Sequence, residues 1–153
     1  MNDERFEARD PDYRARVEAS FARQQAMALL GIALVRVEPG EVELAFAHRD
    51  ALTQQHGFIH AGVLATALDS ACGYAAFSLM AREAAVLSVE FKINLLAPAR
   101  GESFRIVGRV VKPGRTITVC TADAFAMQGD GRRLVATMTG TMMAVLDREG
   151  ISQ

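Results

Sequence analysis

A long apolar segment, residues 61–80, constrains the fold of this chain more than any other feature. Only Thr66, Asp69, Ser70 and Ser78 within it are notably polar. A membrane span has this length, but Asp69 would lie near its centre at a cost of about 2.5–3.5 kcal/mol, and neither end carries an aromatic or basic belt. We therefore predict a buried central helix, which other elements must cover on most sides.

The sequence after this helix has the pattern of a β-sheet. Apolar and polar side chains alternate over residues 88–95, up to the region of Pro98, as expected of a strand. Three more apolar segments, 104–111, 116–127 and 134–146, are separated by glycine-containing turn sequences. We expect these three to form consecutive antiparallel hairpins.

The sequence before the central helix predicts a further helix, a strand hairpin and a loop. Asp10 is suited to cap a helix that runs up to Gly31, with the residues before that helix forming a flexible segment of about 1–10. Residues 32–46 alternate around a Pro-Gly turn and predict a strand hairpin. Residues 49–60 have no strong period and predict a loop or a short irregular helix.

These elements predict one α+β domain over residues 1–153. An antiparallel sheet wrapped around the long central helix, with an additional N-terminal helix, covers the apolar segment most simply. No internal repeat, low-complexity stretch or linker divides the 153 residues. The sheet would leave strand edges and a face of small helical residues uncovered, which predicts a homodimer or a dimer of dimers.

Composition excludes several classes of partner and site. A formal charge of -1 gives no broad basic field for nucleic acid or for an anionic membrane surface. Cys72 and Cys120 have no C-x-x-C spacing, which argues against a disulfide scaffold and a thiolate zinc site. The first twenty residues carry charges throughout and lack the apolar stretch of a secretory signal, so we expect a cytoplasmic protein.

Asp69 is the most informative residue of the central helix. Its neighbours three and four positions away include no cation, so nothing local pairs its charge. Burial without a partner raises the pKa of a carboxyl group, which suits a general base near neutral pH. A structural role for Asp69, as a cap or as the partner of a distant arginine, stays open.

The start of the helix is a second candidate feature. The first backbone N–H groups after His60, at Ala61 and Gly62, have no partner inside a helix and can stabilise a developing oxyanion. His56 and His60 have the i, i+4 spacing of a helical metal pair, but Gly57 interrupts that helix and no carboxylate has a characteristic spacing. We predict no metal and assign His60 to capping or positioning.

Other side chains are weaker candidates for a catalytic or ligand-binding role. No G-x-S-x-G elbow occurs, and a thiol at Cys72 is expected to be a small apolar filler. Ser88 lies on the polar side of its predicted strand, where it would orient water or Asp69 or be an ordinary exposed serine. Arg115, in a Pro-Gly turn, is a candidate for an anionic ligand or simply a solvated side chain.

Four residues are candidates for contact with the substrate. Small side chains such as Gly73 leave room beside the acid, either for a ligand or for close packing. Phe58 and Phe77 are aromatic residues that would shape an apolar pocket or belong to the core. With Arg115 they complete the predicted substrate-binding set.

Four segments together resemble the hotdog-fold acyl-CoA thioesterases of the PaaI-like type, which act in phenylacetate degradation. They are residues 54–62 (QQHGFIHAG), the helix with Asp69, residues 88–91 (SVEF) and residues 97–102 (APARGE). The likeness runs from about residue 29 to residue 146. It implies a hotdog fold, with active sites at a dimer interface within a tetramer.

The resemblance also implies roles for individual residues. His60 and Gly62 match a His-Gly-Gly motif that opens the helix, Asp69 matches the catalytic acid, and Ser88 matches a serine that helps to place the attacking water. Ala61 replaces the first glycine of the motif and keeps its N–H group.

Gln54 replaces an asparagine of the family pattern and would orient water or substrate through its amide. The expected activity is hydrolysis of an acyl- or aryl-CoA thioester by water that Asp69 activates, with coenzyme A as part of the substrate and no separate cofactor. The alternatives are a non-catalytic acyl-CoA-binding or sensing protein and an enoyl-CoA hydratase or dehydratase on the same scaffold. The acyl group itself is not encoded in any motif.

Overall fold

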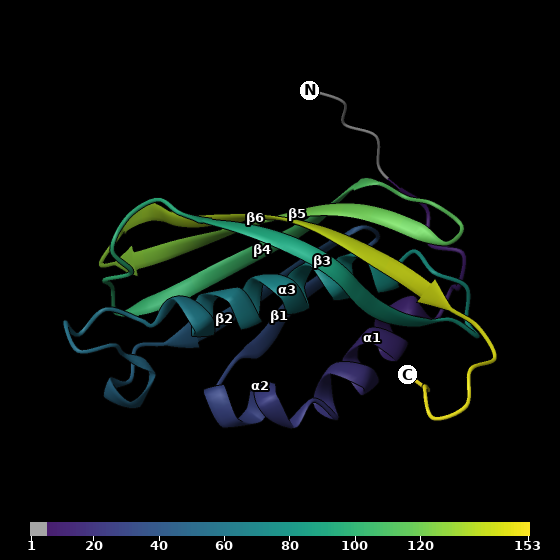
Figure 1. The fold of residues 1–153 in the computed structure, drawn as a ribbon, viewed down its shortest axis with the longest axis horizontal. Helices are drawn as coiled ribbons and strands as arrows, with labels where there is room; N and C mark the ends of the chain where they lie inside the picture. The colour runs from purple at the N-terminus through teal and green to yellow at the C-terminus, as the bar shows by residue number, and fades with distance from the viewer. Residues whose placement is uncertain (1–5) are drawn as a thin grey trace.

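The protein, seen here as a computed structural model, is described over residues 6–153 and consists of one curved sheet with helices on its concave side (Figure 1). Six described strands form an antiparallel sheet in the order β1-β2-β4-β5-β6-β3. The helices are α1 (Tyr13–Ala22), α2 (Gln25–Leu30), the 3-10 helix η1 (Asp50–Leu52) and α3 (Ala61–Phe77), and the strands are β1 (Ala33–Glu38), β2 (Glu41–Ala47), β3 (Ala85–Leu95), β4 (Ser103–Lys112), β5 (Ile117–Gln128) and β6 (Gly131–Val145).

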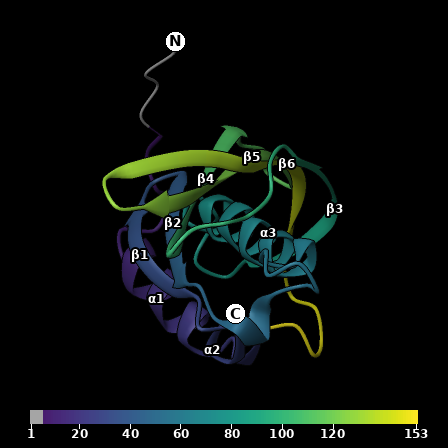
Figure 2. The ribbon, with the colours of Figure 1, turned by 90° about the vertical axis from the view of Figure 1, so that its left-hand side faces the viewer.

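Helix α3 is the centre of the fold, as the apolar segment predicts. The sheet curves around it, with β1 and β2 on one side, β3 on the other and β4 to β6 across the top (Figure 2). Ten of its residues are buried: Leu64, Ala67, Leu68, Ser70, Ala71, Cys72, Tyr74, Ala75, Ala76 and Phe77. None of the described helices is long and apolar enough to cross a membrane.

A glycine lets α3 approach the sheet closely. Gly108 of β4 lies under Ala71, and a Cβ atom added at Gly108 would lie 2.4 Å from the backbone carbonyl atoms of Ala71. Only glycine fits at this distance, because heavy atoms in ordinary contact stay well beyond 3 Å. The distance between α3 and β4 is therefore set by contact between the backbones of Ala71 and Gly108.

The predicted N-terminal helix is wrong in two respects: it begins at Tyr13 with Asp12 and not Asp10 at the N-cap position, and it is two helices. Helix α1 ends at Ala22, and α2 begins after Gln24, which has an extended backbone. The Gln24 amide donates to the Tyr74 hydroxyl (3.1 Å) and its oxygen accepts from Ser70 (3.5 Å), so contacts with α3 favour the break. Gly31 ends α2 at a positive φ of 70°, at the predicted stop.

The segment before α1 contacts the end of α3. Residues 1–5 of the predicted flexible segment lie outside the described residues; beyond them, Phe6 packs on the core and Asp10 is buried. Asp10 forms ion pairs with Arg16 and Arg82 (3.0 Å each). Arg16 also donates to the carbonyl of Met80 (2.9 Å), beyond the C-terminal end of α3, where a cation is favoured.

Gly108→Ala tests the close approach between helix and sheet. The new methyl group would displace α3, so we expect the free energy of unfolding to fall by about 1–3 kcal/mol, as in other overpacked cores. Urea denaturation measures the change. Gly73→Ala is the matched control: its methyl group would meet no atom within 4 Å, and replacing a helical glycine stabilises by about 0.5–1 kcal/mol. Equal effects of the two substitutions would contradict the proposed constraint.

Candidate functional site

Asp69 and Ser88 meet between the central helix and the edge strand. The Ser88 hydroxyl of β3 donates a hydrogen bond of 2.7 Å to Asp69 Oδ1 of α3. Asp69 is half-buried, and within residues 6–153 no other hydrogen bond reaches its carboxylate. The expectation of a buried, unpartnered carboxylate is therefore wrong: Asp69 has a hydroxyl partner, and one oxygen, Oδ2, is left for a ligand or water.

A β-bulge turns Ser88 toward the helix. Ser88 pairs with Met142 of β6, but Glu90 pairs with Thr141, so Val89 is an extra residue in β3. Directly opposite residues share a face of the sheet, and Met142 is fully buried under α3. Of the two roles predicted for Ser88, the structure has the contact with Asp69, and the bulge supplies the turn toward α3 that simple alternation does not predict.

Met142 fills the space beneath this pair. Its sulfur lies 3.4 Å from the Ser88 hydroxyl. Its terminal methyl group lies over Gly140, where an added Cβ atom would be 2.9 Å from that methyl and 3.7 Å from the sulfur of Cys72. Sequence analysis missed Met142 and Gly140, because nothing local to β6 indicates that a residue on α3 will lie above them.

His60 organises the start of α3. Its backbone is extended (φ -61°, ψ 138°), and its ring nitrogen Nδ1 accepts a hydrogen bond of 2.9 Å from the N–H of Gly62. Among the described residues the N–H of Ala61 donates to no partner. The capping role predicted for His60 is present in the structure, and it leaves the Ala61 N–H as the free donor at the positive end of the helix.

One chain does not bring this donor to the acid. Ala61 and Asp69 are eight residues apart on one helix, and at 1.5 Å per residue their backbones are separated by about 12 Å along the axis. An oxyanion lies about 3 Å from its donor and next to the carbon that water attacks. The two groups of one chain are therefore too far apart to contact one another directly.

The loop before α3 holds Gln54 and Phe58. Gln54 donates its N–H to the carbonyl of Phe58 (2.9 Å), and its side-chain oxygen accepts from the N–H of His56. The guanidinium of Arg100 lies 4.9 Å from the centre of the Phe58 ring. Gln54 thus stabilises its own turn, and Phe58 lies at the surface of this loop beside a cation.

The remaining predicted substrate contacts differ in position. Gly73, one turn after Asp69, has open space where a side chain would be. Phe77 is fully buried, with the Arg16 guanidinium 4.2 Å from its ring centre, as expected of the core alternative; its contact with a substrate stays a prediction. Arg115 is exposed in the loop between β4 and β5; its predicted contact with an anion stays a prediction.

The cysteines are unsuited to nucleophilic catalysis. Cys72 and Cys120 are fully buried and unpaired. Burial raises the pKa of the Cys72 thiol far above its usual range and that of Cys120 to about 12, so neither forms a thiolate at neutral pH. Within the part of the chain that the structure describes, no group of three or more His, Cys, Asp or Glu side chains forms a metal cage.

Comparison with known proteins agrees with the fold. The family model described as "Thioesterase superfamily" matches residues 56–131, from the loop before α3 to the start of β6. A curated protein of Saccharolobus solfataricus, named "Putative esterase", is 29% identical over 86% of this chain and 85% of its own length. The PaaI protein of the E. coli phenylacetic acid degradation operon has the same fold at 18% identity, with a TM-score of 0.79 over 88% of this chain and 94% of its own.

A more similar structure is that of a thioesterase family protein from Silicibacter pomeroyi. It is 58% identical, with a TM-score of 0.86, and the match covers 88% of this chain and 98% of that one. The sheet wrapped around α3 is therefore the hotdog fold that the sequence resemblance implies. With this identity over nearly the whole of a family member, the chain belongs to the thioesterase superfamily.

Proposed function

We propose that the protein hydrolyses an acyl-CoA thioester, with Asp69 as the general base. The observation that supports this most directly is the Asp69–Ser88 hydrogen bond, which fixes one carboxylate oxygen and leaves the other free. The open space at Gly73 lies one helical turn away, so a substrate has room beside the free oxygen. A carboxylate held in this way is placed to take a proton from water.

The reaction proceeds through one tetrahedral intermediate. A water oxygen bonds to the thioester carbonyl carbon while its proton passes to Asp69. The Ala61 N–H donates to the carbonyl oxygen as that oxygen becomes negative. When the intermediate collapses, the carbon–sulfur bond breaks, and the leaving sulfur takes the proton from Asp69, so that the free acid and coenzyme A are released. No separate cofactor takes part.

The active unit is a homodimer in this proposal. The separation of about 12 Å between Ala61 and Asp69 within one helix requires that each site take Ala61 from one copy and Asp69 from the other. The edge strand β3 exposes Val89, Phe91 and Leu95, with exposed fractions of 55%, 44% and 55%. A long edge with apolar side chains is typical of a strand that pairs with another chain. A dimer of dimers is compatible with the same contact.

Other residues have supporting roles. His60 fixes the first turn of α3 through Gly62, and Gln54 and Phe58 shape the loop that the substrate passes. Arg115 is our candidate for a contact with the phosphates of coenzyme A, since a guanidinium suits phosphate recognition. A cytoplasmic location remains a prediction, with which the two free cysteines are compatible.

Asp69→Asn tests the general base. Asparagine keeps the shape and still accepts a hydrogen bond from Ser88, so we expect the fold and the unfolding free energy to be nearly unchanged. Turnover of acyl-CoA, followed by release of free thiol, should fall about 10²–10⁴-fold, with a smaller effect on KM. The matched control is Asp123→Asn on β5, whose carboxylate accepts a bond of 2.7 Å from Thr137 but does not line the site.

The same assay separates the alternative functions. Near-normal thiol release by folded Asp69→Asn protein would exclude the mechanism. A non-catalytic binding protein would bind acyl-CoA and release no thiol even with Asp69 present. Hydration of an enoyl-CoA without thiol release would instead indicate a hydratase.

Ala61→Pro tests the oxyanion donor. Proline has no N–H but is favoured at the first position of a helix, and the extended backbone of His60 is compatible with a following proline. We expect a folded protein whose turnover is lower by about 10²–10³-fold. Ala61→Gly retains the N–H and should retain activity; a fully active Ala61→Pro protein would contradict the assignment.

Mixing the two inactive variants tests whether sites are shared between chains. A heterodimer of Asp69→Asn and Ala61→Pro chains has one site with both groups intact if each site takes them from different copies. Random pairing should restore activity at about a quarter of the sites in an isologous dimer. If both groups came from one chain, co-expressed and affinity-selected heterodimers would stay inactive.

Phe91→Lys tests the dimer contact. A lysine on the β3 edge should prevent pairing with a second copy, so light scattering at micromolar protein should show monomers, and activity should be lost. Val35→Lys on β1, the other edge strand, is the control at a similarly exposed position (52%) and should stay dimeric. A wild-type protein that is a stable, active monomer would contradict the proposal.

A further inference from the structure

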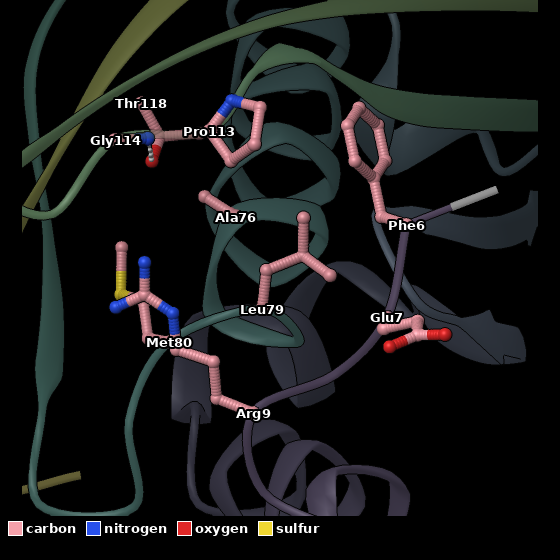
Figure 3. Close-up of a pocket in the computed structure, with 9 residues that line it drawn as sticks. All are labelled: Phe6, Glu7, Arg9, Ala76, Leu79, Met80, Pro113, Gly114 and Thr118. Atoms are coloured by element: carbon pink, nitrogen blue, oxygen red, sulfur yellow. Dashed lines mark hydrogen bonds between the residues drawn. The ribbon is translucent and has the colours of Figure 1, made fainter. Parts of the chain in front are cut away.

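A cavity of about 190 Å³ lies at the C-terminal end of α3, away from the Asp69–Ser88 pair. Ala76, Leu79 and Met80 form one wall, and Pro113 and Phe6 face them (Figure 3). Thr118 of β5 lines the inner end, and Glu7 and Arg9 lie at the outer rim. The lining combines an apolar wall with the polar groups of Glu7, Arg9 and Thr118, and the function proposed above does not use this cavity.

The surface of α3 connects this cavity to the acid. Gly73 and Ala76 follow Asp69 by four and seven residues, so all three lie on one face of the helix. The side chains along this face are small: Gly73 has open space above it, and Ala76 already belongs to the cavity wall. The distance from Asp69 to Ala76 along the axis is about 10 Å.

Met142 lies between the acid and the inner end of the cavity. Across the concave face of the sheet, Ser88, Met142 and Thr118 are directly opposite one another on β3, β6 and β5. Ser88 contacts Asp69, Thr118 lines the cavity, and Met142 is the fully buried residue between them. Its unbranched thioether has three rotatable bonds and adapts to neighbours more readily than other core side chains.

We propose that the acyl chain of the substrate runs from Asp69 along Gly73 and Ala76, displaces the end of Met142 and terminates in the cavity. This inference rests on the proposed function and specifies its substrate class as medium-chain aliphatic acyl-CoA. The path of about 10 Å is longer than an acetyl group or an aryl ring next to the thioester can span. The side chains of Phe6, Leu79 and Met80 form an apolar wall that a hydrocarbon chain can contact, while the polar surface of Glu7 and Arg9 lies at the exposed rim.

Chain-length profiles of three variants test the path. Met142→Ala removes the side chain between acid and cavity, so the ratio of kcat/KM for decanoyl-CoA to that for butanoyl-CoA should rise roughly tenfold or more. Ala76→Leu fills the cavity wall, so the same ratio should fall by a similar factor. Met27→Ala is the matched control: Met27 is a buried methionine of α2, and its loss should leave the ratio unchanged. Thermal unfolding identifies any variant that has failed to fold.

A binding measurement makes the test independent of catalysis. Calorimetry with the non-hydrolysable octyl thioether of coenzyme A should show weaker binding to Ala76→Leu than to the wild type, and unchanged binding to Met27→Ala. Wild-type protein that releases thiol from no acyl-CoA would refute the proposed function, whereas the binding series would still test the path. An active enzyme that prefers acetyl- or phenylacetyl-CoA to octanoyl-CoA overturns the inference. So do Met142→Ala and Ala76→Leu profiles that match that of Met27→Ala.

Discussion

The structure depends on the burial of one apolar helix against a sheet that touches its backbone. Gly108 allows β4 to reach the carbonyl of Ala71, and the strands curve from this contact around both sides of α3 (Figure 2). The sheet cannot close completely, so a strip of the helix with Gly62, Thr66, Asp69 and Gly73 stays at least partly exposed. Asp69 is the only Asp, Glu, Lys, Arg or His residue of α3. The geometry that buries the helix therefore also determines where a carboxylate can meet a substrate.

The opposite side of α3 is held by a polar network instead of by the sheet. The hydroxyl of Tyr74 is within hydrogen-bond distance of Ser20 of α1 and accepts from Gln24, and Gln24 in turn accepts from Ser70. Burial raises the pKa of Tyr74 even though these partners oppose the shift, so the phenol stays neutral and can donate. Because Ser70 follows Asp69 directly, the contacts that break the N-terminal helix also fix the rotation of α3 about its axis.

Sequence patterns predicted the parts of the molecule that depend on local physics. The apolar period of residues 61–80, the Pro-Gly turn at Gly40 and the helix stop at Gly31 each indicate a backbone state that their own side chains favour, and the structure has all three. The break at Gln24 and the bulge at Val89 were not predictable, because each depends on a partner far away in the chain. Asp69 was identifiable as an unusual acid in an apolar helix and Ser88 as a residue that would orient water or Asp69, whereas the bulge that turns Ser88 toward α3 was not predictable.

The bulge also explains why this site lies at a sheet edge. An extra residue disrupts the ladder on the bulged strand, and within residues 6–153 of one chain β6 is the only strand paired with β3, so the disruption affects one neighbour in that chain. The bulge turns Ser88 inward to Asp69. Phe91 and Leu95 pair with Gly140 and Ala136 of β6, and both remain exposed. One local irregularity therefore orients the catalytic candidate and creates the apolar edge that a second copy would cover. If that copy also supplies the Ala61 N–H, association and catalysis depend on the same strand, and loss of the β3 contact removes the oxyanion donor from every site.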